Sequence, residues 1–154
     1  MAPTGVEELT AGDPHAVAAE NARRKATAVG GDPVLGADTL VTVDGEILGK
    51  PRDAAQAVQY LARLAGRAHQ VVGGIALARD GALLAEAVEI TEVVFRALSA
   101  NDIEEYVALG EWEGRAGGYA IQGAGAALVR SITGDYLNVV GLPLARLLDL
   151  LAHS

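Results

Sequence analysis

The chain has 154 residues, with 12 Lys and Arg against 20 Asp and Glu, and a formal net charge of −8. Apolar residues make up 51% and cysteine is absent, so the composition indicates a globular protein and excludes a disulfide scaffold, a thiol nucleophile and a thiolate metal site. The acidic balance argues against nucleic acid polymers as partners, and the sequence shows neither a signal peptide nor a membrane span, so we expect a cytoplasmic protein with no membrane partner.

The first predicted elements are a helix and a hairpin. Pro14 is a favourable first helical residue and Asp13 a favourable N-cap, so a helix is expected to run to Val29, before two glycines. An apolar, β-branched run over 34–43 predicts a strand. An Asp-Gly turn then leads into a return strand over 46–48.

A helix, a second hairpin and another helix are predicted next. Asp53 is expected to cap the helix, which ends near Gly66. The arms of the hairpin cover 69–79 and 83–95, on either side of a second Asp-Gly turn. A capping box opens the following helix, which is expected over 99–109.

The last part of the chain begins with an irregular segment. Residues 110–125 contain six glycines, and a short strand over 126–132 and a Leu-rich helix over 142–151 are expected after them. Helices and strands alternate, with at least two hairpins, so the predicted fold class is α/β with a mixed β-sheet. Only 4% of residues are aromatic, which predicts a core of Val, Leu, Ile and Ala with close backbone approaches. The length suits one domain over 1–154.

Asp38 is the first candidate for chemistry because it interrupts an otherwise apolar strand. A buried carboxylate is costly unless it is paired or binds a cation. Lys50 lies across the hairpin, and a three-residue loop over 43–45 would pair it with Asp38 on one face. A two-residue turn would instead put Lys50 opposite Thr39. The paired register predicts a catalytic centre, and a salt bridge that only satisfies the carboxylate is the structural alternative.

Four other features are weaker candidates. Gln122 lies in the glycine-rich segment 115–125, and its amide offers donors and acceptors to a base edge, although a tight turn is the alternative. A structural role in holding its loop is favoured for Asn138. At most one or two of residues 23–25 can face a cleft, because successive helical residues point about 100° apart. His69 is interpreted as structural.

Four motifs occur in order along the chain. They are GADTLV (36–41), ILGKPRD (47–53), AGGYAIQG (116–123) and GDYLNVVGLPL (134–144). Together they resemble the Maf family of nucleoside triphosphate pyrophosphatases, and the match covers about residues 3–150. The resemblance implies a Maf/ITPase-like α/β fold, with an elongated mixed β-sheet flanked by helices, a central cleft and often a homodimer.

The resemblance also implies an activity. Members of the family hydrolyse a nucleoside triphosphate to the monophosphate and pyrophosphate, with a divalent metal cation, Mg²⁺ or Mn²⁺, as cofactor. The run Tyr119–Gly123 resembles the branch directed at dTTP and UTP. A non-catalytic nucleotide-binding or division-linked regulatory protein on the same fold is the alternative.

The same matching implies roles for individual residues. Asp38 falls on the proposed catalytic base, and Lys50 on a cation of the reaction centre. Thr39 and Gln122 fall on positions tied to substrate choice. Lys25 falls on a cleft position that binds the substrate's phosphates.

Glu8 and Asp38 are the metal ligands that the resemblance implies. The chain departs from the family pattern in lacking its Ser-x-Ser-x-Arg-Arg block, so we expect a single Maf-like domain whose natural start lies upstream. Smaller departures are Arg115 where Lys is usual and Gly73 where Thr is usual. Arginine keeps the charge but changes the donor geometry.

Overall fold

A computed structural model describes residues 7–153, the last of them by its backbone alone, so the expectation about the start of the chain falls outside the described residues. The strands are β1 (Val34–Val43), β2 (Glu46–Leu48), β3 (Ala68–Arg79), β4 (Ala82–Phe95) and β5 (Val129–Thr133). The helices are α1 (Pro14–Thr27), α2 (Ala54–Leu64), α3 (Ala100–Ala108), α4 (Tyr136–Val140) and α5 (Leu144–His153), with 3₁₀ turns η1 (Ala116–Gly118) and η2 (Ala124–Leu128). The predicted helices and hairpins are confirmed, and α4 is an addition to them.

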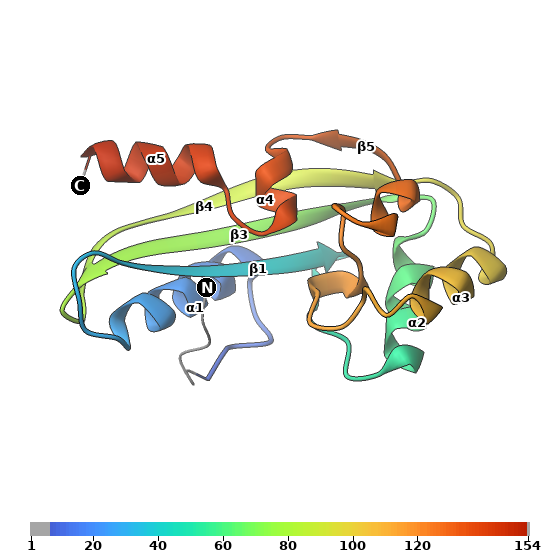
Figure 1. Ribbon diagram of the computed structural model, residues 1–154, viewed down its shortest axis with the longest axis horizontal. Helices are drawn as coiled ribbons and strands as arrows, with labels where there is room; N and C mark the ends of the chain where they lie inside the picture. The colour runs from blue at the N-terminus through green and yellow to red at the C-terminus, as the bar shows by residue number, and fades with distance from the viewer. Residues whose placement is uncertain (1–6, 154) are drawn as a thin grey trace.

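The strands form one elongated sheet in the order β2-β1-β3-β4-β5 (Figure 1). In the part of the chain that the structure describes, all neighbouring pairs are antiparallel. The α/β class and the elongated sheet flanked by helices are therefore confirmed, but the sheet there is antiparallel rather than mixed. The cause is the connectivity, because tight turns join β1 to β2 and β3 to β4, and α2 returns the chain to the opposite side of β1.

The turn between β1 and β2 has two residues and fixes the register of this hairpin. Val43 pairs with Glu46 across it. Both turn residues have positive φ, 53° and 75°, which is the conformation that a type I′ turn requires and that an Asp-Gly pair adopts readily. The three-residue loop is therefore wrong, and with it the direct cross-strand pairing of Asp38 and Lys50.

Helix α1 lies very close to β1 and β3 because small residues face one another. Ala18, Ala22 and Ala26 are fully buried on the helix. A Cβ atom added at Gly36 would lie 2.1 Å from the carbonyl oxygen of Ala22. One added at Gly74 would lie 2.3 Å from that of Ala18. Both strand positions therefore require glycine, and the expected close backbone approach is confirmed.

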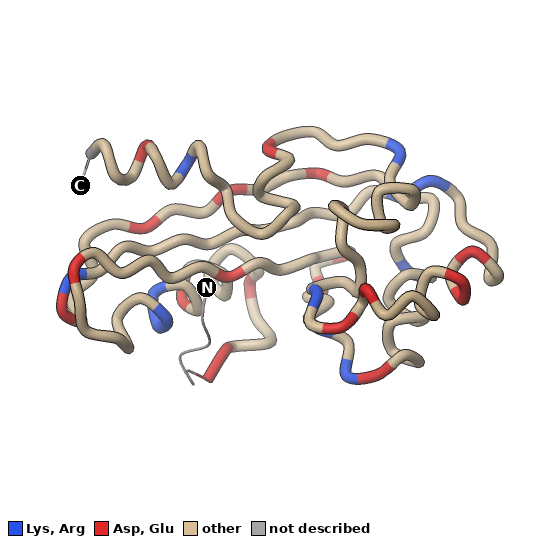
Figure 2. Tube along the Cα trace, viewed as in Figure 1, with Lys and Arg blue, Asp and Glu red and all other residues tan. Residues whose placement is uncertain are grey.

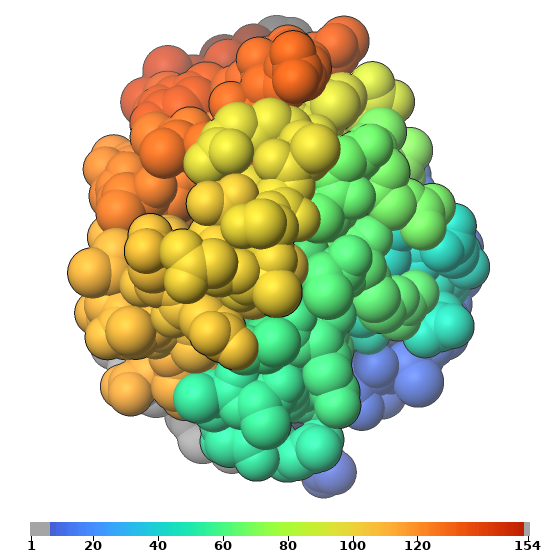
Figure 3. Space-filling model, turned by 90° about the vertical axis from the view of Figure 1, so that its right-hand side faces the viewer, coloured from blue at the N-terminus to red at the C-terminus, as the bar shows by residue number. Residues whose placement is uncertain are grey.

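Helices cover both faces of the sheet (Figure 1). Helix α1 covers one face of β1 and β3. Helix α5 covers the other face at one end, through Leu147. At the opposite end of that second face, α2 and α3 pack side by side (Figure 3) over a core that includes Leu61, Phe95 and Tyr106. The second face therefore has two separate covers, one at each end.

Acidic and basic positions occur at both ends of the molecule, with long uncharged stretches of the strands between them (Figure 2). Eight of the 12 Lys and Arg side chains form an ion pair with a described carboxylate. Among the described residues, the exceptions are Lys50, Arg115, Arg130 and Arg146. No helix within the described range is long and apolar enough to cross a membrane.

Candidate active site

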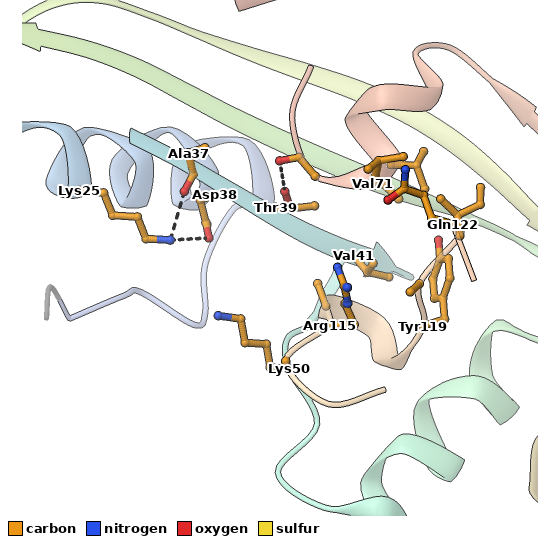
Figure 4. Close-up of a pocket in the computed structure, with 17 residues that line it drawn as sticks. Lys25, Ala37, Asp38, Thr39, Val41, Lys50, Val71, Arg115, Tyr119 and Gln122 are labelled. Atoms are coloured by element: carbon orange, nitrogen blue, oxygen red, sulfur yellow. Dashed lines mark hydrogen bonds and ion pairs between the residues drawn. The ribbon is translucent and has the colours of Figure 1, made fainter. Parts of the chain in front are cut away.

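A cavity of about 410 Å³ opens beside β1, past the point where β2 stops pairing with it (Figure 4). This volume is in the range of small-molecule sites. Charged and polar side chains from distant parts of the sequence line it: Lys25, Asp38, Thr39, Lys50, Arg115 and Gln122. Of the predicted site residues, only Glu8 is elsewhere. It lines an adjoining cavity of about 320 Å³, whose wall also includes Asp38 and Lys50.

Asp38 lies on the α1 side of β1 and is 7% exposed. The side-chain nitrogen of Asn21 donates to its Oδ2 at 3.0 Å, and the Lys25 ammonium lies 3.5 Å from its Oδ1. Burial raises the pKa of Asp38 above its ordinary value, against the hydrogen bond from Asn21 and the charge of Lys25, which lower it. A buried carboxylate with a raised pKa, at the wall of a cavity, is suited to accept a proton.

Lys25 is the cation nearest to that carboxylate. Its Nζ also forms an ion pair with Glu8 at 2.8 Å and donates to the carbonyl oxygen of Ala37, on the open edge of β1, at 3.1 Å. Arg23 and Arg24, by contrast, pair with Glu20 on the same helix, and Arg23 also pairs with Glu86 on β4. The expectation that only one or two members of this basic triplet face the cleft is therefore confirmed.

Asn21 is a site residue that the sequence reasoning missed. It is fully buried. Besides its bond to Asp38, its amide accepts from the backbone nitrogen of Leu9 at 2.7 Å and donates to the carbonyl oxygen of Leu9 at 3.0 Å. Asn21 thus fastens the segment before α1 to the carboxylate. The available signal was its place on the buried alanine stripe of the helix, where a polar side chain needs partners.

Lys50 lies across the cavity from Asp38 rather than against it (Figure 4). In the described part of the chain the two form no ion pair, because the two-residue turn shifts the register. Arg115, just before η1, lines the same wall and was not among the predicted site residues. Neither cation has a described carboxylate partner, so both can bind an anion that enters the cavity.

Thr39 and Gln122 line other parts of the cavity. The Thr39 hydroxyl, on the opposite face of β1 from Asp38, donates to the carbonyl oxygen of Gly141 at 3.3 Å. Gln122 is exposed and lies at the end of the cavity away from Lys25 (Figure 4). The cavity therefore has a charged end around Asp38 and an amide end around Gln122.

An aromatic cluster supports the amide end. Tyr119 lines the cavity, and its hydroxyl lies 2.6 Å from Nε2 of His69. Both rings pack edge to face with Phe95. Burial lowers the pKa of His69 to about 4, so the imidazole is neutral at neutral pH. His69 lines a different pocket, and its contacts with Tyr119 and Phe95 agree with the structural interpretation.

Asn138 is also structural, as predicted. It is fully buried, and its side-chain nitrogen donates to the carbonyl oxygens of Val71 and Glu89 and to the hydroxyl of Thr91. These bonds hold α4 against the sheet, next to the loop that supplies Gly141 to the cavity.

Two carboxylates are available to a divalent cation. No group of three or more His, Asp or Glu side chains that could hold a metal is present among the described residues. Glu8 and Asp38, however, converge on the ammonium of Lys25. Mg²⁺ is commonly held by one or two carboxylates together with substrate phosphates. The donor set therefore fits a cation whose remaining ligands come from a phosphate-bearing ligand and water.

Fold and site together define an α/β protein with a charged cleft at the edge of an antiparallel sheet. A family model described as "Maf-like protein" matches residues 1–154. The chain belongs to this family, as the motifs predicted.

Similar proteins carry a specific name. The chain is 52% identical over 154 residues to a dTTP/UTP pyrophosphatase of Symbiobacterium thermophilum, with 92% of this chain and 78% of the relative covered. It is 53% identical over 121 residues to one of Salmonella typhimurium and 48% identical over 120 residues to one of Pyrococcus furiosus. The chain spans 61% and 63% of the length of the latter two relatives.

Proposed function

We propose that this chain is a nucleoside triphosphate pyrophosphatase that hydrolyses dTTP or UTP to the nucleoside monophosphate and pyrophosphate. The names of its relatives support this activity. The observation that carries it is one cavity in which a buried carboxylate, Asp38, shares the lining with Lys50 and Arg115, two cations that form no ion pair with any described carboxylate. Such an arrangement suits a polyanionic substrate that is attacked by water.

Asp38 is the general base in this proposal. Phosphoanhydride hydrolysis needs an oriented water and neutralisation of charge on the phosphates. Asp38 accepts a proton from the water while the oxygen of that water forms a bond to the α-phosphorus. The bond from that phosphorus to the bridging oxygen breaks, and pyrophosphate leaves with the electron pair. Asn21 keeps the carboxylate in place for this step.

Cations of the cleft bind the phosphates. The ammonium groups of Lys50 and Lys25 act as compact positive charges, whereas the planar guanidinium of Arg115 can bind two oxygens of one phosphate. These groups reverse the local potential in a chain whose net charge is −8. Without this reversal a triphosphate would be repelled.

Thr39 and Gln122 are the proposed substrate-selecting residues. Gln122 carries an amide with both donors and acceptors at the far end of the cavity from Lys25, as base recognition requires. Thr39 lies between the two ends (Figure 4), beside the carbonyl oxygen of Gly141.

Mg²⁺ or Mn²⁺ is the proposed cofactor, with Glu8 and Asp38 as its protein ligands. When bound, such a cation neutralises charge on the phosphate oxygens. The convergence of the two carboxylates on Lys25 supports this assignment.

The test is release of pyrophosphate from dTTP, measured with Mg²⁺ present. We expect Asp38→Asn to lower kcat by about 10³-fold, the scale of losing a general base. Asp149→Asn is the matched control because Asp149 is exposed on α5, and its rate should equal that of the wild type. A wild type that binds dTTP without releasing pyrophosphate would instead support a non-catalytic nucleotide-binding protein.

We also propose a homodimer in the cytoplasm, where nucleoside triphosphates are available. Leucines exposed on α5, Leu144 at 41% and Leu148 at 56%, support pairing of two copies, since exposed apolar side chains mark interfaces when they cluster. Light scattering would give twice the mass of one chain, and a monomer at micromolar concentration would contradict the proposal.

A further inference from the structure

The segment that carries Gln122 is fastened to the rest of the protein by two side chains. We call residues 120–125 the Gln122 loop. The carboxylate of Glu111 accepts from the backbone nitrogens of Ala124 at 2.9 Å and Gly125 at 3.2 Å. The hydroxyl of Tyr106, on α3, accepts from the backbone nitrogen of Ala120 at 3.0 Å. The loop is thus held near both of its ends.

The two side chains also bind each other, which makes them one unit. The Tyr106 hydroxyl donates to Oε1 of Glu111 at 2.9 Å. Tyr106 is buried, whereas Glu111 is half-buried and forms no ion pair with any described cation. The hydrogen bonds from Ala124, Tyr106 and Gly125 lower the pKa of Glu111, the bond from Ala124 most of all, and the charge of Arg115 adds a smaller effect in the same direction. We refer to Tyr106 and Glu111 together as the clamp.

Two glycines of the Gln122 loop lie too close to their neighbours to carry a side chain. A Cβ atom at Gly123 would lie 2.3 Å from a carboxylate oxygen of Glu111. One at Gly125 would lie 2.1 Å from the carbonyl oxygen of Ala120 and 3.0 Å from the Tyr106 hydroxyl. The glycines on either side of position 124 therefore let the loop approach its anchors, which accounts for this part of the motif in physical terms.

Gln122 itself has no side-chain hydrogen bond to any described residue, although it lines the cavity. It also lines a shallow pocket next to Glu111. Because its side chain is free, the backbone of the loop sets the position from which its amide reaches into the cavity. That backbone is fixed by the clamp and by the buried side chain of Ile121.

We propose that Tyr106 and Glu111 are positioning residues for base selection: they hold the backbone that presents the Gln122 amide to the nucleobase. The inference rests on the proposed pyrophosphatase function and extends it to residues that do not line the main cavity. A base recognised through a hydrogen-bonding edge is discriminated only when the partner is held in place, so a loosened loop should lose selectivity before it loses turnover.

The experiment compares Glu111→Gln and Tyr106→Phe with wild type, using dTTP and CTP as substrates and pyrophosphate release as the signal. We expect the ratio of kcat/KM for dTTP over CTP to fall about 10-fold in each variant, through a higher KM for dTTP, with kcat changed less than about 3-fold. Gln122→Ala should show the same fall. Combined with Glu111→Gln it should show no further loss, since residues that act as one unit are not additive.

Glu113→Gln is the matched control. Glu113 is exposed in the same turn as Glu111, and its substitution removes the same charge. It should keep the wild-type ratio. Thermal unfolding of each variant accompanies the kinetics, since a purely structural role would lower Tm and slow both substrates alike. An unchanged ratio in both clamp variants, with a lowered ratio in Gln122→Ala, would overturn the inference.

A wild type that releases no pyrophosphate would contradict the proposed function and not the clamp. The dissociation constants of dTTP and CTP, measured by calorimetry in the same variants, then replace the kinetic ratio. The Kd for CTP divided by the Kd for dTTP should fall about 10-fold in the clamp variants, and a ratio equal to that of the wild type would overturn the inference.

Discussion

The two ends of the cleft are built in different ways. At the Asp38 end, a helix packs against two strands through alanines and glycines, and the site residues project from these regular elements. At the Gln122 end, a glycine-rich loop is held by side chains that bind its backbone. The difference teaches that the charged centre depends on backbone packing, whereas the amide end depends on a few hydrogen bonds. Substitutions can test each half of this contrast separately.

After Asp38, the largest effect is expected at Lys50, across the cavity from that carboxylate. Lys50→Ala should lower kcat/KM for dTTP by about 10²–10³-fold, the scale of losing one preorganised electrostatic contact. Stability should stay within about 0.5 kcal/mol of wild type, because Lys50 has no described ion-pair partner to lose. Arg130→Ala, which also removes a cation without a described partner, should leave the rate unchanged. A large loss of stability in Lys50→Ala would show that the cation is structural.

At the Asp38 end, packing rather than charge should decide stability. Gly36→Ala should destabilise the fold by about 2–3 kcal/mol, because the added Cβ meets the carbonyl oxygen of Ala22. Gly49→Ala is the control, since its Cβ would meet nothing within 4 Å. Urea unfolding measures both. Equal stabilities of the two variants would mean that α1 can move away from the sheet at little cost.

At the Gln122 end, stability should depend on pH through His69. Its folded pKa is about 4, against an ordinary value of 6.5, so the unfolded chain binds a proton between these values that the folded protein does not. Stability therefore falls as the pH drops through this window, by on the order of 2 kcal/mol between about pH 7 and pH 5.

His69→Gln should remove this part of the pH dependence. His15→Gln should keep it, because His15 is exposed on α1. Thermal unfolding across the pH range gives the comparison. Identical pH profiles for His69→Gln and wild type would show that the imidazole is not held neutral by burial.

Local signals in the sequence were sufficient for most of the fold. The predicted caps Asp13, Asp53 and Ser99 all accept backbone hydrogen bonds at helix starts. Both Asp-Gly turns were placed correctly. Helix caps and tight turns depend on residues only a few positions apart, so they can be predicted from the local sequence alone.

Contacts over long distances in the sequence were not predictable in the same way. The register of the β1–β2 hairpin depends on whether its turn has two or three residues. Because the turn has two, Asp38 does not pair with Lys50 and lies against Lys25. The bond from Asn21 to Asp38 and the clamp on the Gln122 loop need the tertiary fold before their partners exist. The candidate site residues were predicted from the resemblance of the motifs to a family, whereas the contacts of these residues could come only from the structure.

The bridge that Lys25 makes between Glu8 and Asp38 gives these two carboxylates a resident counter-ion before any ligand arrives. A divalent ion would have to compete with the ammonium of Lys25 for the two carboxylates. Because Lys25 is part of α1, the effective concentration of this ammonium at the carboxylates is high. Incoming phosphates would offer the displaced ammonium a new anionic partner, so binding of the proposed ion and of the nucleotide would be thermodynamically linked. The affinity for Mg²⁺ should therefore be weak in the free protein and much stronger once a triphosphate is bound.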